Sequence, residues 1–231
     1  MEKNKKAMSN KKAVVKSIAG IFSVGLIIFV SAGTIRYWQG ILYIALVVVM
    51  SGILYFTVSG NRELIEERFK PGAGIKPWDR VYWRLSLILH FVTLVTSALD
   101  AGRFHISPEL PVWLYITATG IYILGQLIFI SARKVNHFFS SVVRIQKDRN
   151  QTVCMDGPYR YIRHPGYLGG LLFTVAIPLL LGSIWGLIPA GITFFTMLLR
   201  TGLEDETLEK ELEGYKAYQA KVRYRLLPHI W

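Results

Sequence analysis

The chain has 231 residues, of which 52% are hydrophobic and only 18% are charged, whereas soluble domains average about 25% charged residues. The charged residues gather between long uncharged stretches, which is typical of a protein with several membrane-spanning helices. The high apolar content excludes a disordered chain, and no heptad pattern persists as a coiled coil would require. A disulfide-rich secreted domain is excluded because Cys154 has no second cysteine to pair with.

The net charge of +12 would also suit a nucleic-acid-binding protein, but the positions of the cations argue against it. Lysine and arginine form short clusters beside apolar runs and do not form a continuous basic stripe. This arrangement favours contact with anionic lipid headgroups and a role in membrane orientation. We therefore expect the lipid bilayer as a partner and no nucleic acid.

Four apolar runs come first in the chain, and each approaches the roughly 20 residues that a bilayer crossing requires. They cover residues 18–35, 38–58, 81–98 and 110–131. The third contains Arg84, which can extend to the interface, and His90, which must face protein or water. A cleavable signal peptide over residues 1–33 is the alternative for the first run, but its apolar stretch is long for that role.

A fifth apolar run, 167–199, is interrupted at Pro178, Gly182-Ser183, Gly186 and Pro189. It is either one kinked span or a hairpin of two short helices that turns at Gly182-Ser183. The hairpin places every lysine and arginine except Arg36 and Arg103 on one side of the membrane, so the positive-inside rule selects it. Both termini are then cytoplasmic, in the inner membrane if the source is bacterial.

The expected fold class is an all-α integral membrane protein with about six transmembrane helices, including the short C-terminal hairpin. Apolar residues between 203 and 222 recur at close to helical spacing, which predicts a cytoplasmic amphipathic helix after the hairpin. The chain divides into a basic cytoplasmic N-terminus at 1–17, four transmembrane helices at 18–131, and a C-terminal region at 132–231.

Two polar groups flank the hairpin. The first is the run 157–167, in which Pro165 favours a helix start and holds Arg163 and His164 at the membrane surface. The second is the acidic triplet 204–206, just past the expected end of the hairpin. Because the hairpin returns to the side it left, we expect the two groups to meet. They are either membrane anchors and helix-terminal charges or the two halves of a site for a ligand with both signs of charge.

The sequence Gly-Pro-Tyr-Arg-Tyr-Ile-Arg-His-Pro-Gly-Tyr at 157–167, the hairpin, and the segments 204–208, 211–218 and 224–228 together resemble the isoprenylcysteine carboxyl methyltransferase and phospholipid methyltransferase families. The resemblance covers roughly 110–231 and is greatest for bacterial members. It implies that the hairpin and the cytoplasmic tail bind S-adenosylmethionine, which makes 132–231 the cofactor-binding catalytic region.

The resemblance also implies roles for individual residues. The expected catalytic residues are Arg163 and His164, the expected substrate contacts are Asn136 and Arg163, and the expected cofactor contacts are Gln151, Val153, Gly157, Tyr159, His164, Pro165, Tyr167, Glu204 and Asp205. Glu204, supported by Asp205, is the candidate partner for the cofactor ammonium. A His-x-Leu element of some family members falls on 151–153, where this chain has no histidine.

The function that follows from the resemblance is S-adenosylmethionine-dependent methylation of a lipidic or hydrophobic acceptor at oxygen, nitrogen or sulfur. His164 is the expected base if the acceptor is an amine. The histidines lack metal-ligand spacing, so no metal is expected. Two alternatives stay open: an NADPH-dependent membrane enzyme similar to the sterol reductases, and a non-enzymatic lipid-binding membrane protein.

Overall fold

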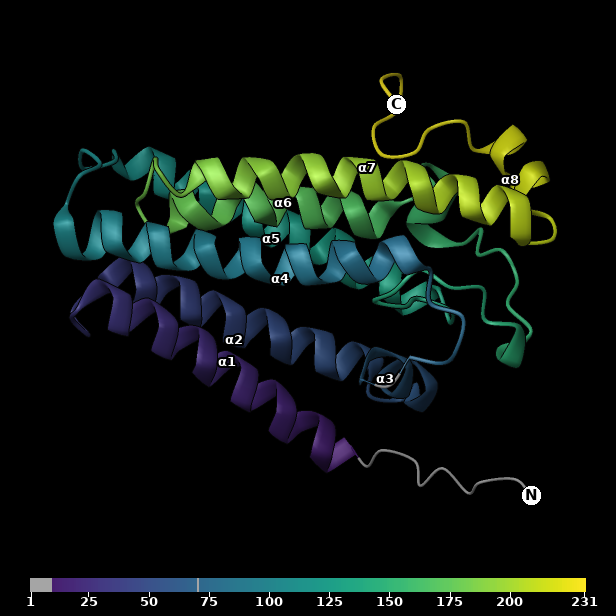
Figure 1. Ribbon diagram of the computed structural model, residues 1–231, viewed down its shortest axis with the longest axis horizontal. Helices are drawn as coiled ribbons and strands as arrows, with labels where there is room; N and C mark the ends of the chain where they lie inside the picture. Colours follow the sequence, from purple (N-terminus) through teal and green to yellow (C-terminus); the bar gives the residue numbers. More distant parts are fainter. Residues whose placement is uncertain (1–9, 70) are drawn as a thin grey trace.

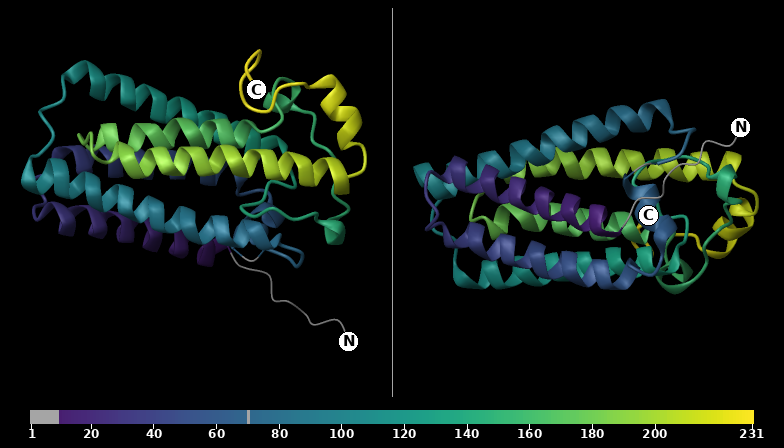
Figure 2. Two further views of the ribbon diagram at one scale, coloured as in Figure 1. Left: turned by 45° about the horizontal axis from the view of Figure 1, so that its top comes forward. Right: turned by 90° about the horizontal axis from the view of Figure 1, so that it is seen from below.

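The computed structural model describes residues 10–69 and 71–231, and every regular element in that part of the chain is helical. The elements are α1 (Asn10–Ala32), α2 (Trp38–Val58), α3 (Arg62–Phe69), α4 (Pro77–Ser97), the π-helix η1 (Ala98–Phe104), α5 (Val112–Val135), the 3₁₀-helices η2 (Lys147–Arg149) and η3 (Gly157–Arg160), α6 (Pro165–Leu180), α7 (Leu187–Glu211) and α8 (Tyr215–Lys221). The long helices form an elongated bundle, with α3, α8 and the C-terminus at one end (Figures 1 and 2). We call this the α8 end.

Among the described residues, four helices are long and apolar enough to cross a membrane, at Lys12–Ala32, Trp38–Val58, Pro77–Phe104 and Val112–Val135, and α6 is a shorter apolar helix. Large apolar side chains such as Phe22, Phe56 and Phe195 point outward from the bundle, which suits contact with lipid. The chain is therefore an integral membrane protein, as expected. The third and fourth spans extend beyond the apolar runs because polar residues at their ends continue the helices.

The turn at Gly182-Ser183 is confirmed. Gly182 has a φ of +75°, a backbone conformation that glycine adopts most easily. The hydroxyl of Ser183 donates a hydrogen bond of 2.5 Å to the Asp100 carboxylate in η1 and accepts one from the Gly186 amide. These contacts fix the turn against the neighbouring helix, and α6 and α7 run back along each other (Figure 1).

The expectation for the segment after the hairpin was wrong in two respects. Glu204, Asp205 and Glu206 do not follow the helix but lie within α7, which continues to Glu211. The single amphipathic helix expected over 203–222 is split, since Gly214 has a φ of +81° and α8 begins at Tyr215. The split folds the apolar residues of 208–222 back against the neighbouring loop, where they bury surface that a straight helix would expose.

A close glycine contact joins α5 to α6. A Cβ atom added at Gly169 would lie 2.4 Å from the carbonyl oxygen of Gly125, and one at Gly125 would lie 2.7 Å from that of Gly169. Such approaches are common where membrane helices pack through small residues. The contact brings the start of α6 close to the end of α5, and these two termini carry polar residues discussed below.

The main apolar core lies within the bundle and includes Ile28, Tyr43, Leu94, Tyr122 and Leu180. It draws on α1, α2, α4, α5 and α6. A second cluster of Leu212, Tyr215, Tyr218 and Val222 lies at the α8 end, outside the bundle. Ile145 and Val153 of the loop 136–159 pack against this second cluster.

Candidate active site

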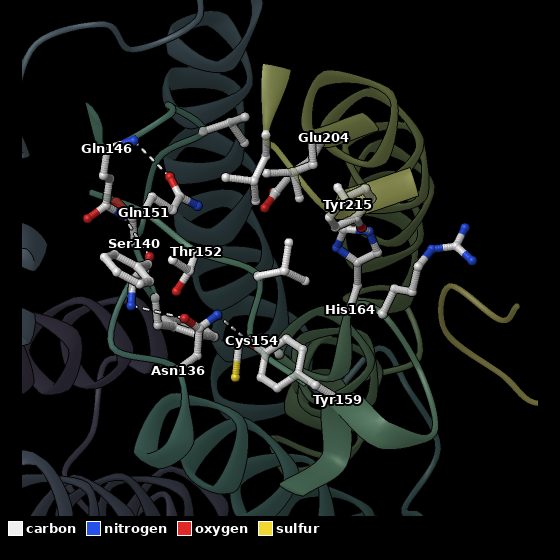
Figure 3. Close-up of a pocket in the computed structure, with 18 of the residues that line it drawn as sticks. Asn136, Ser140, Gln146, Gln151, Thr152, Cys154, Tyr159, His164, Glu204 and Tyr215 are labelled. Carbon is white, nitrogen blue, oxygen red and sulfur yellow. Dashed lines mark hydrogen bonds between the residues drawn. The ribbon is translucent and has the colours of Figure 1, made fainter. Parts of the chain in front are cut away.

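A pocket opens at the α8 end, between the loop 136–159, the start of α6, the last turns of α7, and α8 (Figure 3). Its empty space, counted together with the part open to solvent at the mouth, is about 800 Å³. Figure 3 shows Asn136, Ser140, Gln146 and Gln151 on one side, and His164, Glu204 and Tyr215 on the other. The loop and the helices thus supply opposite walls.

The structure brings most of the predicted site residues to this pocket. The residues that line it are Asn136, Gln151, Val153, Tyr159, Arg163, His164, Tyr167 and Glu204. Gly157, Pro165 and Asp205 do not line it. Gly157 has a φ of +55° and packs against Val135, while Pro165 is the buried first residue of α6. The two groups that flank the hairpin in sequence therefore meet in space.

Asp205 lies behind the pocket wall, where only 1% of its side chain is exposed. Its carboxylate accepts hydrogen bonds from Arg163 (two, both 2.8 Å), His164 (3.0 Å), Tyr215 (2.8 Å), Gln219 (3.3 Å) and Arg225 (2.8 Å). Burial alone would raise the pKa of this carboxyl group, but the hydrogen bonds from His164 and Arg163 outweigh burial and hold the pKa far below its usual value. Asp205 is therefore ionised and fully engaged with protein groups.

The guanidinium of Arg163 is also occupied. Besides its two bonds to Asp205, its Nη1 donates to the carbonyl oxygens of Val222 (2.9 Å) and Arg223 (2.6 Å). The backbone amides of Arg163 and His164 donate to the carbonyls of residues 224 and 225. Arg163 thus fastens the C-terminal segment to the start of α6, and these contacts favour a positioning role over the expected grip on a ligand carboxylate.

Glu204 differs sharply from its neighbour Asp205. It is half-buried and lines the pocket, and its Oε2 accepts a hydrogen bond from the hydroxyl of Tyr167. Its Oε1 makes no hydrogen bond to another residue in the described part of the chain. Glu204 is therefore the carboxylate that remains available to a ligand.

His164 occupies the junction between the pocket and the Asp205 network. Because an ionised carboxylate can only accept a hydrogen bond, the 3.0 Å contact with Asp205 assigns a proton to Nε2 of His164. Nδ1 makes no hydrogen bond to any described residue. The ring stacks on Tyr167, with centroids 5.7 Å apart and planes inclined by 14°. Asp205 and Tyr167 together fix the orientation of the imidazole.

Two tyrosines join the loop to the helices. Asn136 donates a hydrogen bond of 3.1 Å to the hydroxyl of Tyr159, and the hydroxyl of Tyr218 in α8 donates one of 2.7 Å to the backbone carbonyl of Tyr159. Burial raises the pKa of both phenols, so both keep their protons. Tyr159 thus connects the end of α5 with α8 across the floor of the pocket.

Two buried ion pairs hold the loop in place. Arg144 binds Glu67 of α3 through two hydrogen bonds of 2.8 Å. Arg200 of α7 binds Asp79 of α4 at 2.8 Å and also donates to the carbonyl of Ser141. All four charged side chains are at most 7% exposed. Because breaking a buried pair costs about 3–5 kcal/mol, these contacts give a long non-helical loop a defined position.

Sequence reasoning missed several pocket residues. Tyr215 and Tyr218 line the pocket, although their spacing placed them only on the apolar face of the expected cytoplasmic helix. Gln146 and Cys154 also line it. Gln146 donates to the carbonyl of Phe138, and its backbone amide donates to the side chain of Gln151. The i, i+3 spacing of the tyrosines was a usable signal for a buried face but did not show what the face packs against.

The pocket coincides with a segment that known proteins share. Residues 113–213 match the model of the family described as phospholipid methyltransferase. Over 68 residues the chain is 32% identical to protein-S-isoprenylcysteine O-methyltransferase of Schizosaccharomyces pombe, and this match covers 29% of each chain. The chain thus spans less than a third of the length of this curated relative. Residues 113–213, which carry Asn136, His164 and Glu204, are therefore similar to the phospholipid methyltransferase family.

Proposed function

We propose that this protein transfers a methyl group from S-adenosylmethionine to a lipidic or hydrophobic acceptor at the membrane surface. The observation that carries the proposal is the pocket at the α8 end, where the carboxylate of Glu204, with one oxygen available, and the oriented imidazole of His164 face one cavity. Most residues that line the cavity lie in the segment that matches the phospholipid methyltransferase family.

The residues of the pocket suit the groups of S-adenosylmethionine. Its ammonium would pair with the available oxygen of Glu204, since charge-assisted hydrogen bonds are strong in partly buried sites. The side-chain NH₂ of Gln151 makes no hydrogen bond to a described residue and is a donor for the adenine or the carboxylate. Tyr159 and Tyr215 offer aromatic surface. The bound cofactor would supply an electrophilic methyl group attached to a good leaving group.

The protein's own part in the reaction would be positioning and exclusion of water. We assign Arg163 and Asp205 to holding the C-terminal segment 222–225 against α6, because their polar atoms are engaged with each other and with that segment. We assign Gly157 and Pro165 to shaping the loop that presents Tyr159 and His164. Nδ1 of His164 would accept the proton if the acceptor is an amine.

The proposed topology has six membrane helices with both termini in the cytoplasm. The described start of α1 and the whole of α8 lie at the same end of the bundle (Figure 1), which supports an even number of crossings. In this topology α6 and α7 form the fifth and sixth crossings, and the pocket lies at the cytoplasmic surface. A lipid acceptor would then approach from the bilayer between the helices, with Asn136 among its contacts.

Binding of the cofactor is the first test. The purified protein in lipid nanodiscs would be titrated with S-adenosylmethionine and, separately, with NADPH, and binding would be followed by calorimetry. We expect saturable binding of S-adenosylmethionine alone. Saturable binding of NADPH without S-adenosylmethionine would instead identify a reductase, and binding of neither would refute the proposal.

Transfer is the second test. Membranes with and without the protein would receive S-adenosylmethionine that carries an isotope label in its methyl group, and labelled products would be identified by mass spectrometry. We expect a labelled lipid or hydrophobic small molecule that depends on the protein. A label found only in water-soluble products would contradict the proposed acceptor class.

A further inference from the structure

A second cavity lies between α1, α2, α3 and the end of α5 and shares no lining residue with the methyl-transfer pocket. Its empty space, counted together with the part open to the surface, is about 1030 Å³. The walls contributed by α1 and α2 are mainly apolar, and the end formed by α3 and α5 is basic. The methyl-transfer reaction proposed above makes no use of this space.

The basic end contains Lys16, Arg68 and Arg133, and no aspartate or glutamate of the described chain lines the cavity. Arg133 is only 4% exposed. Its Nε is buried without any hydrogen-bond partner, and its Nη2 reaches the carbonyl of Leu64 at a long 3.4 Å. A buried cation without a counter-ion is unfavourable, so this cavity lacks an anion that its charges would stabilise.

Two acids of α3 are engaged elsewhere. Glu63 of α3 pairs with Arg149 at 2.7 Å, and Glu67 of the same helix pairs with Arg144 at 2.8 Å. Both pairs join α3 to the loop of the methyl-transfer pocket, away from the cavity. Arg68 lies close enough to Arg133 to repel it electrostatically. Since no described aspartate or glutamate lines the cavity, an anion bound there would be part of a ligand.

The rest of the cavity has the dimensions of an acyl chain site. It shares Val24, Val47, Ser51 and Leu54 with a further apolar cavity of about 650 Å³ that extends to Tyr43. Along α2 the two cavities run from Val58 to Tyr43, which at 1.5 Å per residue is about 22 Å. One leaflet contributes about 15 Å of hydrocarbon, so the two adjoining cavities, together called the groove below, extend over a length that matches its depth.

We propose that this groove binds one anionic phospholipid from the leaflet at the α8 end. The headgroup phosphate would lie against Arg133, with Lys16 and Arg68 at the rim, and one acyl chain would lie between α1 and α2. The basic residues at one end of the groove and the apolar walls along the rest suit a lipid that has an anionic headgroup and an acyl chain. This site is separate from the methyl-transfer pocket and does not depend on the proposed reaction.

The test measures lipid retention by native mass spectrometry. Detergent-solubilised protein would be incubated with phosphatidylglycerol, phosphatidylcholine or inorganic phosphate. We expect one phosphatidylglycerol molecule to be retained in preference to phosphatidylcholine, and Arg133→Gln to weaken that retention about tenfold or more. Arg103→Gln is the matched control, because Arg103 is an exposed arginine in the last turn of η1, away from the cavity.

A second variant guards against misfolding. Lys16→Gln combined with Arg68→Gln changes the charge at the rim of the cavity and should also weaken phosphatidylglycerol retention, while binding of S-adenosylmethionine stays unchanged. Equal retention of the two lipids would overturn the proposal. So would full retention by both variants, or inorganic phosphate binding as tightly as phosphatidylglycerol.

Discussion

Two adjacent carboxylates, Glu204 and Asp205, offer a sharp test of the site because the structure gives them opposite environments. Glu204 faces the pocket with one oxygen free. Asp205 is 1% exposed and accepts hydrogen bonds from five side chains. Replacing each by its amide changes one charge and almost no volume. We therefore expect Glu204→Gln to affect ligand binding and Asp205→Asn to affect stability.

For Glu204→Gln, the amide oxygen can still accept the hydrogen bond from Tyr167, so the fold should be retained. The loss is the charge that would face the cofactor ammonium. A hydrogen bond to a charged group contributes about 1.5–3 kcal/mol, which corresponds to a roughly 10- to 150-fold rise in the Kd for S-adenosylmethionine. Calorimetric titration measures this change directly.

For Asp205→Asn, Arg163 and Arg225 lose their common counter-ion in a buried position. The expected loss is about 3–5 kcal/mol of unfolding free energy, or roughly 6–20 °C in Tm for a chain of this size. Thermal unfolding followed by tryptophan fluorescence measures it. If Asp205→Asn kept its stability while losing cofactor affinity, or if Glu204→Gln unfolded and kept that affinity, the assignment of the two carboxylates would be wrong.

Three further outcomes are expected. The hydrogen-bond partners of Asp205 depress the pKa of its carboxyl group. The ionised carboxylate therefore stabilises the fold above the ordinary carboxyl pKa of about 4, and this stabilisation is lost as the pH falls toward the lower pKa of the folded state. Thermal unfolding at decreasing pH should show the loss, and Asp205→Asn should make the loss smaller. Gly169→Ala should lower the Tm, since its Cβ would lie 2.4 Å from a backbone oxygen, whereas Gly120→Ala, with nothing within 4 Å, should not. The half-buried thiol of Cys154 lines the pocket and burial raises its pKa, so alkylation measured by intact mass should be slow at neutral pH and slower with S-adenosylmethionine; an unchanged rate would place the cofactor elsewhere.

The apolar runs predicted the long helices well because a bilayer imposes their length and composition. The positions of Gly182 and Ser183 also predicted the turn of the hairpin, since a glycine with positive φ is a local requirement. Helix ends were less predictable. The acidic triplet was expected beyond a helix because charge is excluded from the hydrocarbon, yet α7 continues to Glu211, since charge does not prevent a helix from extending into water.

The proximity of Arg163 and Asp205 followed from the topology, but their function did not. The motifs indicated that the two groups would meet, and they do. What no pattern showed is that the guanidinium is occupied by the C-terminal segment. Such contacts join residues 60 positions apart through loops, and sequence spacing carries no information about them. The same holds for α3, whose Glu67 anchors the pocket loop.

The distribution of buried charge explains why a pocket can form at this end of the bundle. Within a bilayer, apolar side chains gain little by packing against one another instead of lipid, so close helix contacts such as Gly125 with Gly169 hold the spans together. The loop 136–159 has no such contacts and few regular hydrogen bonds. It is fixed instead by Glu67 with Arg144 and by Asp79 with Arg200, each linking it to a different helix. Losing either pair should therefore loosen the loop and weaken ligand binding before it unfolds the spans.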